Sequence, residues 1–178
     1  MKKPTYAKHL QLYAWAGKYV YGKDVVDIGC GEGYGLQVMS VFAKSVVGID
    51  ISPRFTKIAR GNKYHCQSNI IEGDLEKSTS FLRSISEGTV VTAFEILEHV
   101  GYPNKVLEDI CHLPLIASVP HDYPHPLHLT NYASPEDVFA LFSPHYKQVD
   151  ILFWTEGSFH TVAEKQCERY VVICTPKQ

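Results

Sequence analysis

VVDIGCGEGYG, at residues 25–35, is the stretch that decides the fold, because a short apolar run in it leads into closely spaced glycines. The apolar run has the length of a buried strand, and the glycines permit a tight turn with a bare backbone. Several backbone N–H groups then point to a place that a ligand can approach closely. The stretch therefore predicts a strand, a turn and the start of a helix around a nucleotide-like cofactor.

The apolar runs in the rest of the chain indicate a parallel sheet. They lie at residues 24–30, 45–51, 69–71, 88–94 and 113–119. Segments with helical spacing follow the first, second and fourth runs, and apolar strands that alternate with helices are typical of a parallel sheet covered on both faces. Two helix starts are predicted at Ser52-Pro53 and Ser134-Pro135, where a capping side chain precedes a proline.

The end of the chain predicts a different strand arrangement. Residues 146–154 and 166–175 are strand-like runs that are separated by a loop containing Gly157, without a helix-length pattern. They predict an antiparallel hairpin that closes the sheet. We therefore expect one α/β domain over residues 1–178, with a doubly wound, mostly parallel, seven-stranded sheet. A chain of 178 residues with 45% hydrophobic content can bury one such core.

Charge and cysteine content limit the classes of partner and compartment. The net charge is −2, and Lys and Arg are spread along the chain without the basic stripe that nucleic-acid binding favours. The composition therefore does not support nucleic acid as a partner, although RNA stays an open alternative. Five cysteines without a CxxC pair indicate a reducing compartment. Lys8, His9 and Gln11 interrupt the N-terminal apolar residues, so we expect no signal peptide, no membrane span and a cytoplasmic protein.

The glycine-rich turn differs from the nicotinamide and flavin fingerprint. That fingerprint needs a third small residue three positions after the second glycine, and Tyr34 stands there. Glu32 is also a poor neighbour for a pyrophosphate. Asp50, about twenty residues beyond the turn, ends the second run, where a carboxylate can accept both hydroxyls of a ribose. Its alternative role is an acidic cap of the helix that starts at Ser52-Pro53.

Four segments together resemble a known family. GKDVVDIGCGEGYG, VVGIDIS, IIEGDLE and FEILEHV are similar, in order and spacing, to successive motifs of the class I S-adenosylmethionine-dependent methyltransferases. The branch with the ubiquinone-pathway O-methyltransferases is the most similar, and the resemblance extends over roughly residues 9–142. It implies a Rossmann-like methyltransferase fold, S-adenosylmethionine as cofactor and S-adenosylhomocysteine as product. The fourth segment lacks the motifs of enzymes that methylate base amines, and no Pro-Cys pair is present for attack on a pyrimidine ring.

The resemblance also implies a cofactor site. Its residues would be Asp27, Gly29, Cys30, Gly31, Gly33, Asp50, Ile51, Asp74, Leu75 and Glu95. In the family the turn holds the methionine end, and the position of Glu95 lies near the transferring methyl. Asp50 and Ile51 would hold the ribose and flank the adenine, and the pair at 74 and 75 would meet the adenine edge. Residues 1–23 would cover the site, with Tyr13 either closing over the cofactor or packing in the core.

The chemistry of methyl transfer points to a base near the fourth strand. The sulfonium leaving group needs no proton, so the protein supplies alignment and, for a hydroxyl acceptor, removal of a proton. We predict that His99 is this base, that Glu98 orients it, and that His128 belongs to the same catalytic group. The alternative is that Glu98 and His99 only open a helix, where an acidic residue suits the helix dipole.

The same residues also resemble a metal site. Glu95, Glu98 and His99 are spaced i, i+3 and i+4, so they share one helical face, and His128 is the candidate fourth ligand. This set is similar to the metal site of methyltransferases that act on the 3′-terminal 2′-hydroxyl of small RNAs. A Leu-Glu-His sequence is, however, widespread in this fold without metal. We therefore assign no metal ligand and treat a divalent metal as an alternative that is not favoured.

The loop over residues 118–133 is the candidate substrate lid, because loops at this end of a doubly wound sheet cover the ligand crevice. Of its histidines, His121 and His125 are expected to have no role in the chemistry. The predicted function is methyl transfer to an oxygen of a small molecule. The alternatives are a metal-dependent RNA 3′-end 2′-O-methyltransferase and an inactive cofactor-binding module that serves a partner subunit. The sequence determines neither the acceptor nor the oligomeric state.

Overall fold

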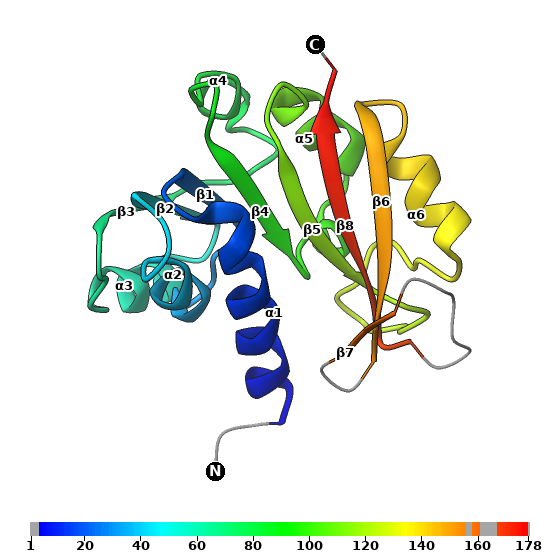
Figure 1. The fold of residues 1–178 in the computed structure, drawn as a ribbon, viewed down its shortest axis with the longest axis horizontal. Helices are drawn as coiled ribbons and strands as arrows, with labels where there is room; N and C mark the ends of the chain where they lie inside the picture. The colour runs from blue at the N-terminus through cyan, green and yellow to red at the C-terminus, as the bar shows by residue number, and fades with distance from the viewer. Residues whose placement is uncertain (1–3, 156–157, 161–166, 178) are drawn as a thin grey trace.

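The computed structural model describes residues 4–155, 158–160 and 167–177, in which eight strands form one sheet (Figure 1). The strands are β1 (Asp24–Ile28), β2 (Ser45–Asp50), β3 (Gln67–Glu72), β4 (Val90–Phe94), β5 (Leu115–Pro120), β6 (Tyr146–Thr155), β7 (Ser158–His160) and β8 (Arg169–Pro176). Their order is β3-β2-β1-β4-β5-β8-β6-β7. The first five strands pair in parallel, and β8 pairs antiparallel with both β5 and β6.

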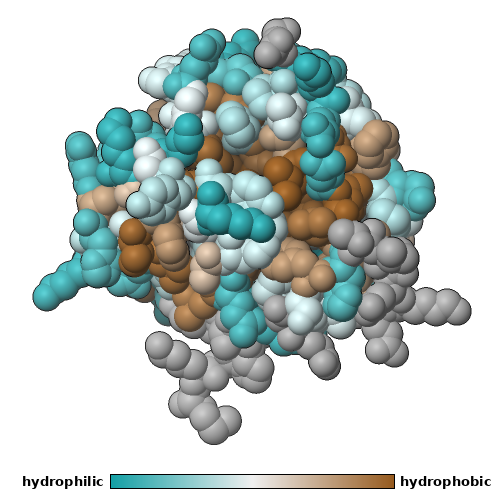
Figure 2. Space-filling view, in the orientation of Figure 1, coloured by the Kyte–Doolittle hydropathy of each residue, from teal (hydrophilic) through white to brown (hydrophobic). Residues whose placement is uncertain are grey.

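Helices cover both faces of this sheet, as a doubly wound fold requires. They are α1 (Pro4–Val20), α2 (Tyr34–Met39), α3 (Pro53–Arg60), α4 (Thr79–Arg83), the 3₁₀ helix η1 (Leu97–His99), α5 (Pro103–Ile110) and α6 (Pro135–Phe142). One buried cluster contains residues of α1, α2 and α3, and a second contains residues of α4, α5 and α6. Figure 1 shows α1 in front of the sheet and α5 and α6 behind it. Figure 2 shows hydrophobic residues gathered near the middle of the front face.

The fold predicted from the sequence is confirmed, with one addition. Seven strands were expected, and the short strand β7 is an eighth, paired antiparallel with the end of β6. The predicted hairpin is formed by β6 and β8, and β8 lies between β5 and β6. The two predicted helix starts are also found. The Ser52 hydroxyl accepts a hydrogen bond from the Phe55 amide, and Ser134 forms a capping box with Asp137.

The strand order places a crevice at the carboxyl ends of the parallel strands. From β1 the chain proceeds to β2 and β3 on one side, and it then crosses to β4 and β5 on the other side. The loops after β1 and β4 therefore leave the sheet in opposite directions, and ligands bind at such a switch point. Within the described residues, no helix has the length and apolar character that crossing a membrane requires.

Tyr13 joins α1 to α2 through a close contact with a glycine. The Tyr13 side chain is 4% exposed and lies over Gly35, in the first turn of α2. A Cβ atom at residue 35 would lie 2.1 Å from Cζ of the Tyr13 ring. Because ring atoms cannot approach a methyl group so closely, this packing requires glycine at position 35.

We expect Gly35→Ala to lower the free energy of unfolding by about 1–3 kcal/mol, because the buried Tyr13 ring has to move. Urea denaturation at constant pH measures this change. Gly61→Ala is the matched control, because Gly61 has φ −80° and a Cβ there would lie 3.3 Å from its nearest neighbouring atom. Equal midpoints for the two variants would contradict the packing argument.

Candidate functional site

The glycine-rich turn is held against the end of β2 by main-chain hydrogen bonds. The amides of Gly29 and Cys30 both donate to the carbonyl oxygen of Ile49, at 2.8 and 3.1 Å. Gly29 has φ +75°, and a Cβ atom there would lie 2.4 Å from the Ile96 side chain. Both the dihedral angle and the contact require glycine. The turn therefore presents a bare backbone opposite Ile96, as the sequence predicted.

Asp50 fastens the same turn from the second strand. Its two carboxylate oxygens accept hydrogen bonds from the amides of Gly31 and Ser52, each at 2.8 Å. The first bond fixes the turn, and the second holds Ser52, which is itself the N-cap of α3. Asp74, at the end of β3, accepts from the Glu76 amide and pairs with Lys77 at 2.9 Å. The hydrogen bond from Lys77 lowers the pKa of Asp74, which favours its ionised form.

These strand ends enclose a cavity of about 130 Å³, which we call the β2 cavity. It is lined by Gly29, Asp50, Ile51, Gly73, Asp74, Leu75, Glu76, Ile96, His99 and Val100. Five of the residues predicted to contact the cofactor therefore come together. Cys30, Gly31 and Gly33 do not line this cavity. The Cys30 side chain is buried and lies against Gly48 of β2.

Asp27 lies beneath the turn, in the core, and it does not line the β2 cavity. Its carboxylate is 0% exposed and accepts hydrogen bonds from the hydroxyls of Thr92, at 2.6 Å, and Tyr13, at 3.2 Å. Burial raises the pKa of Asp27 to about 7, although both hydrogen bonds lower it. Asp27 thus ties α1, β1 and β4 together. Tyr13 packs in the core, which was the alternative to closing over a cofactor.

A larger cavity, of about 480 Å³, opens beside the ends of β4 and β5, and we call it the β5 cavity. Its lining consists of Lys8, His9, Glu95, Glu98, His99, Pro120, Tyr123, His128, Glu168 and Arg169. Four of these were predicted from the sequence as a catalytic group or as part of the cofactor site: Glu95, Glu98, His99 and His128. His99 also lines the β2 cavity, so this side chain stands where the two cavities meet.

The backbone directs Glu95 into the β5 cavity. Glu95 follows β4 and has φ +53°, which non-glycine residues rarely adopt. Its amide donates to the carbonyl oxygen of Ser118, and its carboxylate accepts from the Ser118 hydroxyl at 2.7 Å. These two contacts from β5 hold the strained residue in place. Strain of this kind is typical of functional sites.

Glu98 is a buried carboxyl group with an unused oxygen. The side chain is 1% exposed, and its Oε2 atom has no hydrogen-bond partner. Burial raises the pKa of Glu98 to about 8, and the charge of Glu95 adds to this effect. The backbone oxygen of Glu98 accepts hydrogen bonds from the amides of Leu129 and Thr130, at 2.7 and 3.3 Å. These bonds attach the lid to η1.

The tautomers of two histidines follow from their hydrogen bonds. Nδ1 of His99 lies 2.9 Å from the carbonyl oxygen of Leu127, and Nδ1 of His128 lies 2.9 Å from that of Tyr123. A carbonyl can only accept, so both Nδ1 atoms carry a proton, and in the neutral rings Nε2 keeps its lone pair. Nε2 of His99 lies 3.8 Å from a Glu98 oxygen. Ligand atoms of Glu98, His99 and His128 all lie within 4.8 Å of one another, and Glu95 is not part of this group.

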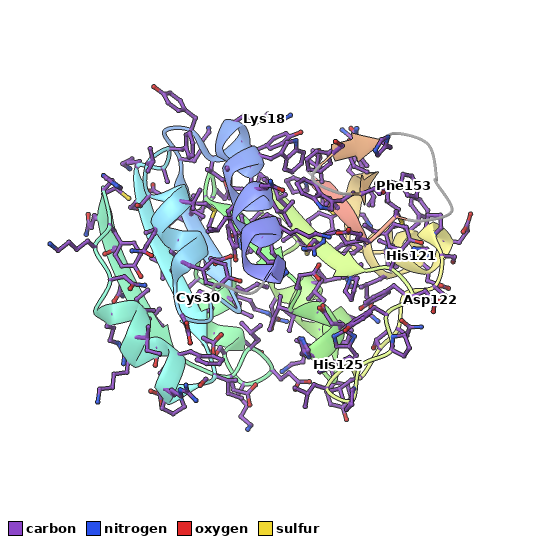
Figure 3. All side chains as sticks on the ribbon, turned by 90° about the horizontal axis from the view of Figure 1, so that it is seen from below. Lys18, Cys30, His121, Asp122, His125 and Phe153 are labelled. Carbon is purple, nitrogen blue, oxygen red and sulfur yellow. The ribbon has the colours of Figure 1, made fainter. Side chains whose placement is uncertain are left out.

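The predicted lid follows β5 and carries these contacts. Figure 3 looks at the site from below, with Cys30 near one end of α1 and with His121, Asp122 and His125 on the lid. Neither His121 nor His125 lines the β2 or the β5 cavity. Apolar side chains of the lid are exposed, at 59% for Tyr123, 67% for Leu127 and 66% for Leu129.

Six residues of the β5 cavity were not predicted: Lys8, His9, Pro120, Tyr123, Glu168 and Arg169. Lys8 and His9 lie in the segment that was expected to cover the site, but nothing in their spacing marks them individually. Arg169 begins an apolar strand-like run, but the sequence alone does not show which cavity its side chain reaches. It stands two residues before Val171, so in a strand the two side chains lie on the same face, and Val171 is fully buried.

Comparison with known proteins identifies the family. Residues 5–146 match the family model described as a methyltransferase domain. The chain belongs to this methyltransferase family. A ubiquinone biosynthesis O-methyltransferase from Paraburkholderia phymatum is 30% identical over 108 residues, which are 60% of this chain and 47% of that relative. The methyltransferase chain thus spans about half the length of this curated relative.

Solved structures support the fold of this methyltransferase. The small RNA methyltransferase HEN1 is similar with a TM-score of 0.78 and 19% identity, over 96% of this chain and 25% of that one. A SAM dependent methyltransferase from Archaeoglobus fulgidus has a TM-score of 0.68 and 19% identity, over 94% of this chain and 93% of that one. At such identities the structures show the fold alone.

S-adenosylmethionine is the cofactor of the family, and the β2 cavity of this methyltransferase fits its nucleoside. Because Gly29 has no side chain, Ile96 can pack directly on the turn, where a Cβ atom would lie 2.4 Å from it, and both residues line the cavity. Asp50 lines the same cavity, where a carboxylate would hold ribose hydroxyls. Ile51 beside it is 65% exposed, so an adenine would cover an apolar side chain.

We expect Asp27→Asn to flatten the pH dependence of stability. The folded state binds the Asp27 proton more tightly than the unfolded chain, with a pKa of about 7 against 3.8. The free energy of unfolding therefore falls as pH rises from about 4 to about 7, by up to about 1.4 kcal/mol per pH unit for this group. Asn cannot ionise, so the variant loses this part of the slope. Urea denaturation at several pH values measures it.

Asp24→Asn is the matched control for Asp27→Asn, because Asp24 begins the same strand and its side chain is partly exposed. A hydrogen bond from Ser45 lowers the pKa of Asp24, so its own contribution changes only below pH 4. The control should keep the slope of the unchanged protein between pH 4 and 7. An unchanged slope in Asp27→Asn would show that the buried carboxyl group is not the cause.

Proposed function

We propose that this methyltransferase transfers the methyl group of S-adenosylmethionine to an oxygen atom of a small molecule that binds in the β5 cavity. One observation carries the proposal: His99 lines both cavities. A cofactor with its nucleoside in the β2 cavity would therefore present its methyl group to the β5 cavity beside this side chain. Relatives named ubiquinone biosynthesis O-methyltransferases support oxygen as the acceptor atom.

In this proposal the chain's residues align the acceptor and remove its proton. Nε2 of His99 keeps its lone pair, because Nδ1 donates to the Leu127 carbonyl oxygen. This atom would accept the hydroxyl proton as the oxygen attacks the methyl group in line. Glu98 Oε1 lies 3.8 Å from Nε2, and above about pH 8, where this buried carboxyl group is ionised, it would stabilise the imidazolium that forms. The bond between the methyl carbon and the sulfonium sulfur breaks to leave a neutral thioether, so no general acid is needed.

The lid favours an acceptor with an aromatic or apolar part. The exposed side chain of Tyr123 lines the β5 cavity, and burying it against a ligand would be favourable; Leu127 and Leu129 are exposed on the same loop. A phenol combines such a ring with an oxygen nucleophile. We therefore choose 3,4-dihydroxybenzoate as the acceptor probe, because it is small enough for a cavity of about 480 Å³.

We expect His99→Ala to reduce kcat on this probe by about 10²–10⁴-fold, which is the range for loss of a general base. The affinity for S-adenosylhomocysteine, measured by calorimetry, should change by less than about tenfold, since His99 is one of many residues that line the β2 cavity. His125→Ala, which changes a lid histidine outside both cavities, is the control and should keep full turnover. Full turnover of His99→Ala would reject the catalytic role. Cofactor binding without transfer to any phenol would favour an inactive module.

A second candidate function is metal-assisted methyl transfer to a hydroxyl at the 3′ end of RNA. The observation in its favour is the convergence of Glu98, His99 and His128, with the unused Oε2 of Glu98 and two Nε2 lone pairs. Two imidazoles and a carboxylate fit a divalent transition metal. Such a cation would act as a Lewis acid that makes a bound hydroxyl easier to deprotonate. The structural likeness to the small RNA methyltransferase HEN1 suggests RNA as the acceptor, while the net charge of −2 disfavours it.

Chelation separates the two candidates. For the small-molecule function we expect turnover on the phenol probe to survive exhaustive chelation, with no stoichiometric metal in elemental analysis. Under the metal-assisted function, chelation would remove activity, divalent ions would restore it, and His128→Ala would lower metal content as well as turnover. His121→Ala is the control, because His121 lies outside the group of three ligands. A 3′-terminal ribose diol and the phenol are then compared as acceptors.

A further inference from the structure

Arg169 is a buried cation with unused hydrogen-bond donors. It begins β8, opposite Pro120 at the end of β5, and it is 6% exposed. Its guanidinium lines the β5 cavity, and neither Nε nor Nη1 has a hydrogen-bond partner. A buried charged donor without a partner is costly, so structures rarely keep one unless a ligand completes it.

The protein compensates this charge only in part. Among the residues that the structure describes, the nearest carboxylate oxygen, on Glu95, lies 3.8 Å from Nη1, beyond hydrogen-bond distance. That same oxygen already accepts a hydrogen bond from Ser118, at 2.7 Å. Glu95 is therefore held toward β5 while it faces the guanidinium. An attraction of charges remains, but no bidentate pair forms between Glu95 and Arg169.

Glu168 and His9, two other ionisable residues of the cavity, are bound to partners other than Arg169. Glu168, the preceding residue, forms its ion pair with Lys8 at 2.5 Å. His9 contacts the Tyr34 hydroxyl through Nδ1 at 3.0 Å. Burial and the charge of Arg169 lower the pKa of His9, so the ring is neutral near pH 7. The guanidinium is thus the buried cation of this cavity that an incoming anion would meet.

We propose that Arg169 binds a carboxylate group of the acceptor, so that this methyltransferase selects acidic small molecules. The inference rests on the proposed function for the place of the acceptor. A guanidinium offers its donors in a planar fork that matches a carboxylate, and such pairs are strong when water is excluded. A singly charged group also suits the cavity better than a phosphate, because Glu95, Glu98 and Glu168 line it too.

The position of Arg169 favours the acceptor over the cofactor as the source of the carboxylate. The cofactor also carries a carboxylate, on its methionine end. None of the residues of the glycine-rich turn lines the β5 cavity, and Arg169 does not line the β2 cavity. The cavity that holds Arg169 is instead the one that holds His99 and the lid residues Tyr123 and His128. The experiment distinguishes the two sources.

The test measures binding rather than turnover, so it does not depend on catalysis. The protein is saturated with S-adenosylhomocysteine and titrated by calorimetry with 3,4-dihydroxybenzoate and, separately, with 3,4-dihydroxybenzamide, which lacks the charge. We expect the benzoate to bind the unchanged protein at least about tenfold more tightly. Arg169→Met should remove this preference and leave the amide affinity unchanged. Arg169→Lys, with a charge but no planar fork, should keep part of it.

Lys8→Met is the matched control, because it removes a cation of the same cavity that is already paired with Glu168. It should change the preference by less than about threefold. Equal binding of the two probes to the unchanged protein would overturn the proposal, and so would a preference that survives in Arg169→Met. A loss of S-adenosylhomocysteine binding in Arg169→Met would assign the guanidinium to the cofactor and overturn it as well. Binding without methyl transfer would reject the proposed function and leave this inference standing.

Discussion

The carbonyl oxygen of Ile49, at the end of β2, is the acceptor on which the site depends. It receives the amides of both Gly29 and Cys30 and thereby pulls the chain after β1 sharply toward β2. The amide of Gly31 then meets the Asp50 carboxylate of the same strand end. Gly29, Gly31 and Gly33 have positive φ angles, and glycine adopts such angles with little strain. The turn therefore stays open above the sheet, and the β2 cavity forms beside it.

Asp27, which lies below the turn, is a buried carboxyl group whose ionisation is unfavourable. Asp27 has no exposure to solvent, and its two donors, Thr92 and Tyr13, come from β4 and α1. A carboxylate in this position joins three elements that are distant in sequence, but its ionisation opposes folding. Two hydrogen bonds offset part of the desolvation. The geometry of the turn is therefore stabilised by a group that lowers the stability of the domain above neutral pH.

Local signals in the sequence predicted the parallel strands and the glycine-rich turn, and the family resemblance supplied five residues of the β2 cavity. An apolar run, a capping serine or a glycine in a tight turn can each be recognised from a few neighbouring residues. The β5 cavity has no such signal. His99 and Glu98 could be proposed from one short segment, whereas Arg169 reaches the cavity only because β8 inserts between β5 and β6. The exposure of the lid residues and the tautomer of His99 depend on long-range contacts, which one sequence does not display.

The two cavities differ in how completely their polar groups are satisfied. In the β2 cavity, Asp50 and Asp74 accept hydrogen bonds from backbone amides, so the rim is formed before any ligand arrives. In the β5 cavity, Glu98 keeps an oxygen and Arg169 keeps two nitrogens without partners, although both side chains are buried. Unpaired buried groups cost stability unless something else provides their contacts. In the function that we propose, the β2 side is therefore organised to hold a constant cofactor, and the β5 side leaves its strongest unmet interactions for the acceptor.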